Sequence, residues 1–329
     1  AFSAAPLPLL VALGAGLLGG LAYWLAYRRF GRDAEASVAP TVLASFKPVG
    51  DGQSEFSVVG ALTPGEVGTL ADEHVDPVDV TASVVDLAVR GHLVITQLPR
   101  GGEFRPTEWT LSRGSASSVV SPYEQAILDA LAGPGSGPML LSDAAPALAS
   151  ALPAIQAGLY DEVVRKGWFV ARPDRTRGRW SRLGWIALVV AAIVAVALIA
   201  LTSFGLLALV LVALAAGVGM LGQIMPARTA AGSSALAGLG MLRGLLLTQP
   251  TDQAPRGREH EQLASVLPYA IVLGGADRWL DSLASVNDQA KPDETELSWY
   301  HGPSGWTLAD LPDSLRNFVR AFNGTLVSR

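Results

Sequence analysis

The stretch LGWIALVVAAIVAVALIALTSFGLLALVLVALAAGVGMLGQIM, residues 183–225, decides the fold class of this chain. It consists of two apolar runs, residues 183–203 and 206–225, separated only by Phe204 and Gly205. Each run has about the 20 residues that a helix needs to cross the hydrocarbon layer of a membrane. We therefore predict a transmembrane hairpin with a tight turn.

A third apolar run, residues 7–27, predicts another transmembrane helix near the start of the chain. Arg28, Arg29 and Arg32 follow this run, and further arginines lie between residues 175 and 182, just before the hairpin. The positive-inside rule places such arginine-rich flanks in the cytoplasm. We predict a multi-pass protein of the bacterial inner (plasma) membrane, with its N-terminus outside and its soluble domains and C-terminus cytoplasmic.

The composition limits the chemistry available to the protein. Charged residues make up only 16% of the chain, against roughly 25% in ordinary soluble domains. There is no cysteine, so disulfides, thiolate metal sites and cysteine nucleophiles are excluded. None of the three apolar runs contains Asp, Glu, Lys, Arg or His. A transport pathway needs such groups, so the runs are interpreted as anchors.

The region between the first span and the hairpin is soluble in character. Residues 33–62 predict a short β-like segment and a linker. Residues 63–113 predict two helices and a β-hairpin, which is the outline of a winged helix, and residues 121–174 predict a second, similar unit. The expected fold class is a mainly α membrane protein with an α+β cytoplasmic part that contains tandem winged-helix-like domains.

Helix-start signals support the first of these units. Thr63 is followed three residues later by Glu66, which forms a capping box, and Asp76 before Pro77 repeats the device for the next helix. Gly91 is expected to end that second helix.

The charge distribution argues against nucleic-acid binding. Residues 33–174 hold 18 acidic and 8 basic side chains. The candidate reading helix, residues 76–91, carries three aspartates and one arginine, Arg90. Phosphate contacts dominate affinity for nucleic acids, so this face is expected to repel them. We therefore favour protein–protein docking over DNA binding.

Residues 229–329 predict a cytoplasmic helical tail. Its first apolar part, Ala235–Thr248, is interpreted as too short to span a membrane. The later stretch LPYAIVLGGADRW, residues 267–279, predicts a buried helix that ends at the glycine pair after Leu273. We expect Tyr269 and Trp279 to pack against the winged-helix units or the preceding tail helix.

No motif in the chain predicts a catalytic, cofactor-binding or metal-binding residue. The four histidines, His74, His92, His260 and His301, do not occur in a metal-binding spacing, and no phosphate-binding loop or nucleophile elbow is present. The acidic stretch 72–76 could hold a cation, but it is interpreted as a helix end followed by the next cap. We predict a protein that is not an enzyme and has no cofactor or evident small-molecule substrate.

Three segments occur in a characteristic order, with the hairpin between the first two: LTPGEVGTLADEHVDPVDVTASVVDLAVRGHLVI, LPYAIVLGGADRW and SWY. They resemble the YciQ-like family of predicted bacterial membrane proteins, which is classed as a domain of unknown function. The resemblance extends from Ala39 onward and implies an inner-membrane protein with a large cytoplasmic part. Members of this family often carry an extracellular β-rich domain and a glycine-rich tail, so the full gene product is expected to be longer at both ends.

The predicted function is that of a membrane-anchored scaffold or accessory subunit of a bacterial inner-membrane complex, which docks partners through its acidic cytoplasmic domain. The expected partners are membrane lipids and other membrane proteins of that complex. Two alternatives remain open: a membrane-bound transcription regulator, and an accessory subunit of a transporter or channel.

Overall fold

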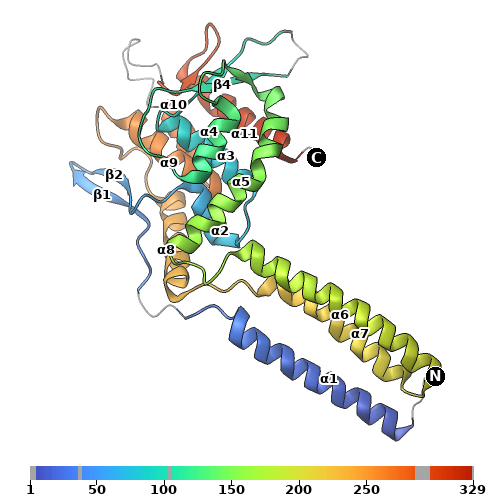
Figure 1. Ribbon diagram of the computed structural model, residues 1–329. Helices are drawn as coiled ribbons and strands as arrows, with labels where there is room; N and C mark the ends of the chain where they lie inside the picture. The colour runs from blue at the N-terminus through green and yellow to red at the C-terminus, as the bar shows by residue number, and fades with distance from the viewer. Residues whose placement is uncertain (1–4, 36–38, 103–105, 286–296, 328–329) are drawn as a thin grey trace. The chain divides into compact units, whose positions relative to one another are not determined.

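The computed structural model describes most of the chain, namely residues 5–35, 39–102, 106–285 and 297–327. It divides into two compact units, and each is assembled from two separate stretches of sequence. The membrane unit comprises residues 1–39 and 164–234, and the globular unit comprises residues 40–163 and 235–329. The hairpin thus interrupts the sequence of the globular unit. Figure 1 shows the helices and strands of both units.

The membrane unit contains the three predicted spans as long helices. They are α1 (Pro6–Ala26), which continues into a π-helical turn, η1 (Tyr27–Gly31), α6 (Pro173–Leu201), and α7 (Gly205–Leu221), which continues into the short η3 (Gly222–Ile224). Most of their large apolar side chains are exposed, as expected for surfaces that face lipid. Helix α6 begins ten residues before the predicted span, so its arginine-rich flank is itself helical.

Glycines let the membrane helices approach closely. A Cβ atom at Gly184 would lie only 2.6 Å from the Cα atom of Gly219, so α6 and α7 touch backbone to backbone. Gly217 similarly faces the ring of Tyr23 on α1, where a Cβ would come within 2.9 Å. Small residues at such crossings are how membrane helices pack without a hydrophobic driving force.

Helix α8 (Ala230–Thr248) corrects the prediction for the start of the tail. It has 19 residues and is long and apolar enough to cross a membrane, so the expectation that this segment is too short was wrong. It is the fourth such helix among the residues that the structure describes. One side of it, however, carries Leu239, Leu242 and Leu246, which are at most 3% exposed.

The first stretch of the globular unit begins with a β-hairpin and continues mainly as helices. Its elements are β1 (Ala44–Gly50), β2 (Gln53–Val58), α2 (Pro64–Asp72), α3 (Pro77–Val89), β3 (Leu93–Gln97), β4 (Trp109–Arg113), α4 (Pro122–Ala132), β5 (Met139–Leu140), η2 (Leu141–Asp143) and α5 (Ala144–Arg165). The order helix, helix, hairpin predicted for residues 63–113 is present as α2, α3, β3 and β4.

The second stretch of the globular unit is helical apart from one short strand. It contains most of α8, then α9 (Glu259–Leu273), α10 (Ala276–Ser285), β6 (Tyr300–His301), η6 (Leu308–Asp310) and α11 (Leu311–Val327). The residues expected as a tail therefore form an integral part of a folded unit. The parts of the predicted tail at 286–296 and 328–329 lie outside the described residues.

A four-stranded sheet joins the segments that were predicted to be separate. Its strand order is β5-β4-β3-β6. Strand β3 pairs antiparallel with β4 and parallel with β6, where Ile95 lies opposite Tyr300. Strand β5, from the predicted second winged-helix unit, pairs with β4 of the first. The expectation of two tandem units is therefore corrected to one globular unit with a shared sheet.

Helix α3 is the centre of this unit rather than an exposed reading helix. Every residue from Asp79 to Ala88 is buried, although the segment includes two carboxylates. Asp79 is 1% exposed and Asp86 is 7% exposed. The prediction that this helix exposes an acidic face to phosphate was therefore wrong, because Asp79 and Asp86 are buried. Neighbouring protein covers residues 79–88 on all sides, so this part of the helix has no free face to place in a DNA groove.

The stretch at residues 267–279 lies where it was expected. It forms the end of α9 and the start of α10, with Gly274 and Gly275 between them at positive φ. Trp279 donates a hydrogen bond from Nε1 to the Leu246 carbonyl of α8 at 2.9 Å, which confirms the expected packing on the tail helix. Tyr269 instead binds the Leu62 carbonyl at 2.6 Å, just before the predicted first unit.

Candidate functional site

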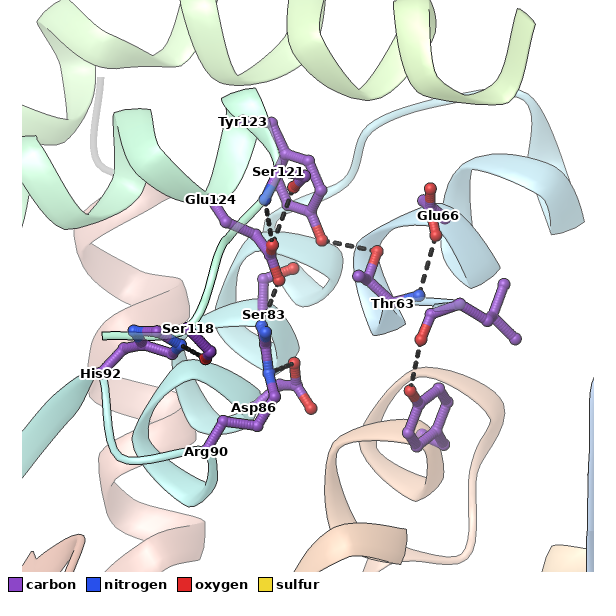
Figure 2. A network of polar contacts seen from close by, with 12 residues as sticks. Thr63, Glu66, Ser83, Asp86, Arg90, His92, Ser118, Ser121, Tyr123 and Glu124 are labelled. Atoms are coloured by element: carbon purple, nitrogen blue, oxygen red, sulfur yellow. Dashed lines mark hydrogen bonds and ion pairs between the residues drawn. The ribbon is translucent and has the colours of Figure 1, made fainter. Parts of the chain in front are cut away.

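A buried polar network lies at the centre of the globular unit, where α2, α3, α4 and α9 meet (Figure 2). Its nodes are the capped N-termini of α2 and α4 and an arginine at the end of α3. These elements present their side chains to one another because proline follows each N-cap residue and fixes where the helix begins. Its members are Thr63, Glu66, Ser83, Asp86, Arg90, Ser121, Tyr123, Glu124 and Tyr269.

Arg90 supplies the positive charge that the carboxylates of the network share. Its Nε donates to Asp86 Oδ2 at 2.8 Å, one helical turn back on α3, and its Nη2 donates to Glu124 Oε1 on α4. Glu124 is 2% exposed, and its other oxygen accepts from the backbone N–H and the hydroxyl of Ser121, at 2.7 and 2.8 Å. One guanidinium thus serves two buried carboxylates and fastens α3 to the cap of α4.

The electrostatics of this ion-pair group are asymmetric. Burial raises the pKa of Asp86 to about 6, with the attraction of Arg90 acting to lower it and the nearby Glu124 acting to raise it. The group carries two potential negative charges and one positive charge. Arg90 therefore holds in place carboxylates that would otherwise be costly to bury.

Two tyrosines extend the network to α2 and α9. Tyr123 on α4 donates to the hydroxyl of Thr63 at 2.7 Å, while the backbone N–H of Thr63 donates to Glu66 at 2.8 Å. The hydroxyl of Tyr269 on α9 reaches the carbonyl of the preceding residue, Leu62. Burial raises the pKa of both phenols well above the ordinary value. Both tyrosines therefore act as neutral hydrogen-bond donors.

Two glycines allow α2 to lie directly on α3. A Cβ at Gly65 would lie 2.8 Å from Ser83 Oγ, and one at Gly68 would lie 1.7 Å from Asp79 Oδ1. Asp79 also accepts a hydrogen bond from the backbone N–H of Asp76 at 3.0 Å, which completes the capping box of α3. The glycines are thus needed because the carboxylate of Asp79 occupies the space that a side chain on α2 would fill.

Asp79 should make the stability of the globular unit depend on pH. Burial raises its pKa to about 8, so the folded state holds this proton more tightly than the unfolded chain, whose aspartates titrate near 3.8. The stability that this proton contributes is fully present below about pH 4, is lost as the pH rises from there to about 8, and changes little above that value. We expect the free energy of unfolding to fall by about 1 kcal/mol per pH unit between pH 6 and 8, and this slope to disappear in Asp79→Asn.

The measurement is the thermal unfolding midpoint of the detergent-solubilised chain across that pH range. Asp252→Asn, at an exposed position, serves as the control and should keep the native slope. A native slope retained in Asp79→Asn would show that other groups cause the pH dependence.

The histidines and the acidic stretch at 72–76 occupy separate positions. His92 is buried, with Nε2 2.9 Å from the hydroxyl of Ser118, whereas His301 is exposed at the sheet edge. Asp72 binds the backbone N–H of His74 at 2.9 Å. Among the residues that the structure describes, no three His, Asp or Glu side chains are arranged to hold a metal ion.

The cap at Thr63 is predictable from the sequence, whereas the network that it joins is not. Arg90 was considered only as a charge on a reading helix, and Glu124 was not singled out. Ser121-Pro122 with Glu124 three residues after the serine is the same capping-box signal as at Thr63, and it could have placed Glu124 at a helix start. No local pattern pairs it with Arg90, which is 34 residues away.

A groove on the surface of the globular unit lies between α9, α10 and α11. It has a volume of about 230 Å³. Its lining is mainly apolar: Val78, Ile271, Ala276, Leu280, Leu315 and Val319, with Asp277, Arg316 and Arg320 among the lining charges. Arg316 is held by Asp277, Asp281 and Asp313 at 2.5, 2.8 and 3.0 Å. Arg320 is exposed.

These features define a membrane protein with several apolar helices and one globular unit that is held together by a buried polar network. Residues 57–283 match the model of the C-terminal domain of predicted membrane proteins, DUF2207, so the chain belongs to this family. The match runs from β2 to α10 and includes the hairpin and every member of the network. No curated protein and no solved structure shows significant similarity to the chain.

Proposed function

We propose that this protein is a non-enzymatic, membrane-anchored docking subunit of a complex in a bacterial inner membrane. The observation that carries the proposal is the groove between α9, α10 and α11. Concave apolar surfaces rimmed by polar groups are typical of binding sites. The apolar residues of the groove can bind the apolar face of a helix, and Arg320 can form an ion pair with a carboxylate beside that face. The occupant we propose is a cytoplasmic helix of a partner membrane protein.

The anchoring part of the proposal rests on the three helices α1, α6 and α7. Their apolar segments carry no Asp, Glu, Lys, Arg or His, and glycines bring them together, so they can hold the globular unit at a membrane without forming a charged path. We propose that α8 packs on the globular unit instead of forming a fourth span. The arginines that flank α1 and α6 support an outside N-terminus and a cytoplasmic globular unit. The YciQ-like resemblance supports the same topology.

Affinity purification in a mild detergent, followed by mass spectrometry, tests the docking proposal. A partner present in a defined ratio should copurify with the native chain and be lost from Val319→Glu, because that change places a carboxylate among apolar groove residues. Asn317→Glu adds the same charge to the same helix at an exposed position, and should keep the partner. Equal recovery of the partner with both variants would show that the groove is not the docking site.

The remaining alternatives predict different results. A transcription regulator would show salt-sensitive binding of DNA by the full chain. Because α3 is buried, that reading would require another element to enter the groove of the DNA. An accessory subunit of a transporter or channel would copurify with a protein whose spans carry ionisable residues.

A further inference from the structure

The arginine-rich start of α6 forms an ordered stripe. Arg175, Arg179 and Arg182 are spaced at i, i+4 and i+7, so they share one face of the helix, and all three are exposed. The stripe runs toward Trp185, which is 69% exposed at the start of the apolar segment. An exposed tryptophan below a row of arginines is typical of the boundary between hydrocarbon and headgroups.

The helix geometry gives the depth of each arginine. Residues 183–201 span about 28 Å at about 1.5 Å per residue, which matches the hydrocarbon thickness of roughly 30 Å. Arg182 and Arg179 then lie about 2 and 6 Å outside the hydrocarbon, within a headgroup layer that is roughly 5–8 Å thick. Arg175 lies about 12 Å outside, beyond that layer.

The membrane unit has a large excess of positive charge. Its two stretches contain 11 basic and 3 acidic side chains. Each acidic side chain is already bound by an arginine of the same unit: Asp33 by Arg228 at 3.2 Å, Glu35 by Arg32 at 2.5 Å and Asp174 by Arg172 at 2.8 Å. In the described part of the chain, the guanidinium groups of Arg179 and Arg182 form no ion pair.

The end of α1 adds further charge beside the stripe. The ring of Phe30 in η1 lies 6.5 Å from that of Trp180 on α6, which places the exposed Arg28 and Arg29 near the same part of α6. Arg28 stacks over Trp24 at 4.8 Å, in the manner of a cation held at the membrane boundary by an aromatic ring. The end of α1 and the start of α6 thus both contribute arginines near the same boundary of the membrane.

We propose that Arg179 and Arg182 bind the phosphate of an anionic phospholipid, with Arg28 and Arg29 strengthening the local field. Planar guanidinium groups form two-pronged hydrogen bonds with phosphate oxygens, and their depth matches that of a lipid phosphate. The acyl chains of the lipid lie against the exposed apolar side chains below, such as Trp185 and Ile186. This site is separate from the docking groove and does not depend on it.

Native mass spectrometry of the full chain in mild detergent tests the proposal, with equal amounts of phosphatidylglycerol and phosphatidylcholine as probes. The native chain should retain phosphatidylglycerol preferentially. Each basic residue near an anionic membrane surface contributes about fivefold in affinity, so Arg179→Gln/Arg182→Gln should lower this preference by about 25-fold. Arg100→Gln/Arg256→Gln removes the same charge from exposed positions in the globular unit and should leave it unchanged.

Three outcomes would overturn the proposal. The first is equal retention of the two lipids by the native chain, and the second is an unchanged preference in Arg179→Gln/Arg182→Gln. The third is displacement by excess inorganic phosphate, which would identify a site for a free anion. If the glutamine pair fails to insert, Arg179→Lys/Arg182→Lys keeps the charge that directs insertion and loses the two-pronged bonds. Its preference should be weaker than that of the native chain, and an equal preference would contradict the assignment.

Discussion

Replacing Arg90 with methionine is expected to lower the free energy of unfolding of the globular unit by about 3 kcal/mol, because it leaves Asp86 and Glu124 buried without their shared cation. This loss is smaller than for a fully buried ion pair, because the Arg90 side chain is 34% exposed and water screens its charge. The thermal midpoint of the solubilised chain should fall by roughly 10 °C. Tryptophan fluorescence provides the readout, because Trp109 and Trp279 are buried in this unit.

A second substitution separates the lost ion pair from lost packing. Adding Glu124→Gln to Arg90→Met removes one of the two unpaired carboxylates, so the double variant should be more stable than the sum of the single changes predicts. The effect of Arg90→Met should also shrink at acidic pH, where Asp86, with its raised pKa of about 6, is protonated and needs no cation. Strict additivity at neutral pH would show that the arginine acts through its aliphatic stem.

Gly238→Ala should destabilise the globular unit by about 2 kcal/mol, since a Cβ at this position would lie 1.8 Å from the backbone oxygen of Thr41. Because this oxygen is a backbone atom, it cannot rotate away from the new methyl group as a flexible side chain could. The same change at Gly240, on the exposed side of α8, has open space around it. Gly240→Ala should therefore be neutral or stabilise the helix by up to about 1 kcal/mol.

The comparison of these two glycines tests the placement of α8. If α8 crosses the membrane as a fourth span, away from the segment at Thr41, the two alanine variants should have similar unfolding midpoints. A clear difference, with Gly238→Ala the less stable, would support a helix packed on the globular unit. Gly244→Ala, also surrounded by open space, provides an independent second control.

The sequence predicts well those features that depend on neighbouring residues. The apolar runs of α1, α6 and α7 needed only length and composition, and the caps at Thr63 and Asp76 needed only residues three positions apart. The buried end of α9 was found in the same way, from helical spacing and a following glycine pair. Each of these signals is local, because the hydrogen bonds or apolar contacts concerned join residues within one or two turns.

What the sequence does not predict are the contacts between distant segments. Strand β6 has only two residues and no alternating pattern, and it becomes a strand because β3 offers it a free edge. The segment Ala235–Thr248 predicted from its apolar residues covers only part of α8, which begins at Ala230. The aspartates of α3 were read as exposed because charge usually indicates solvent. Their burial depends on Gly68 and Arg90.

The split of the globular unit across the hairpin has a consequence for biosynthesis. Ile95 on β3 pairs with Tyr300 on β6, so this pair cannot form until the ribosome has made the intervening chain. Synthesis proceeds at about 5–20 residues per second, so the edge of β3 stays unpaired for roughly 10–40 s. During that interval the hairpin enters the membrane while residues 40–163 of the globular unit still lack their partner stretch, residues 235–329. Nascent molecules on one messenger RNA therefore display unpaired strand edges close together, where one chain can pair with the next.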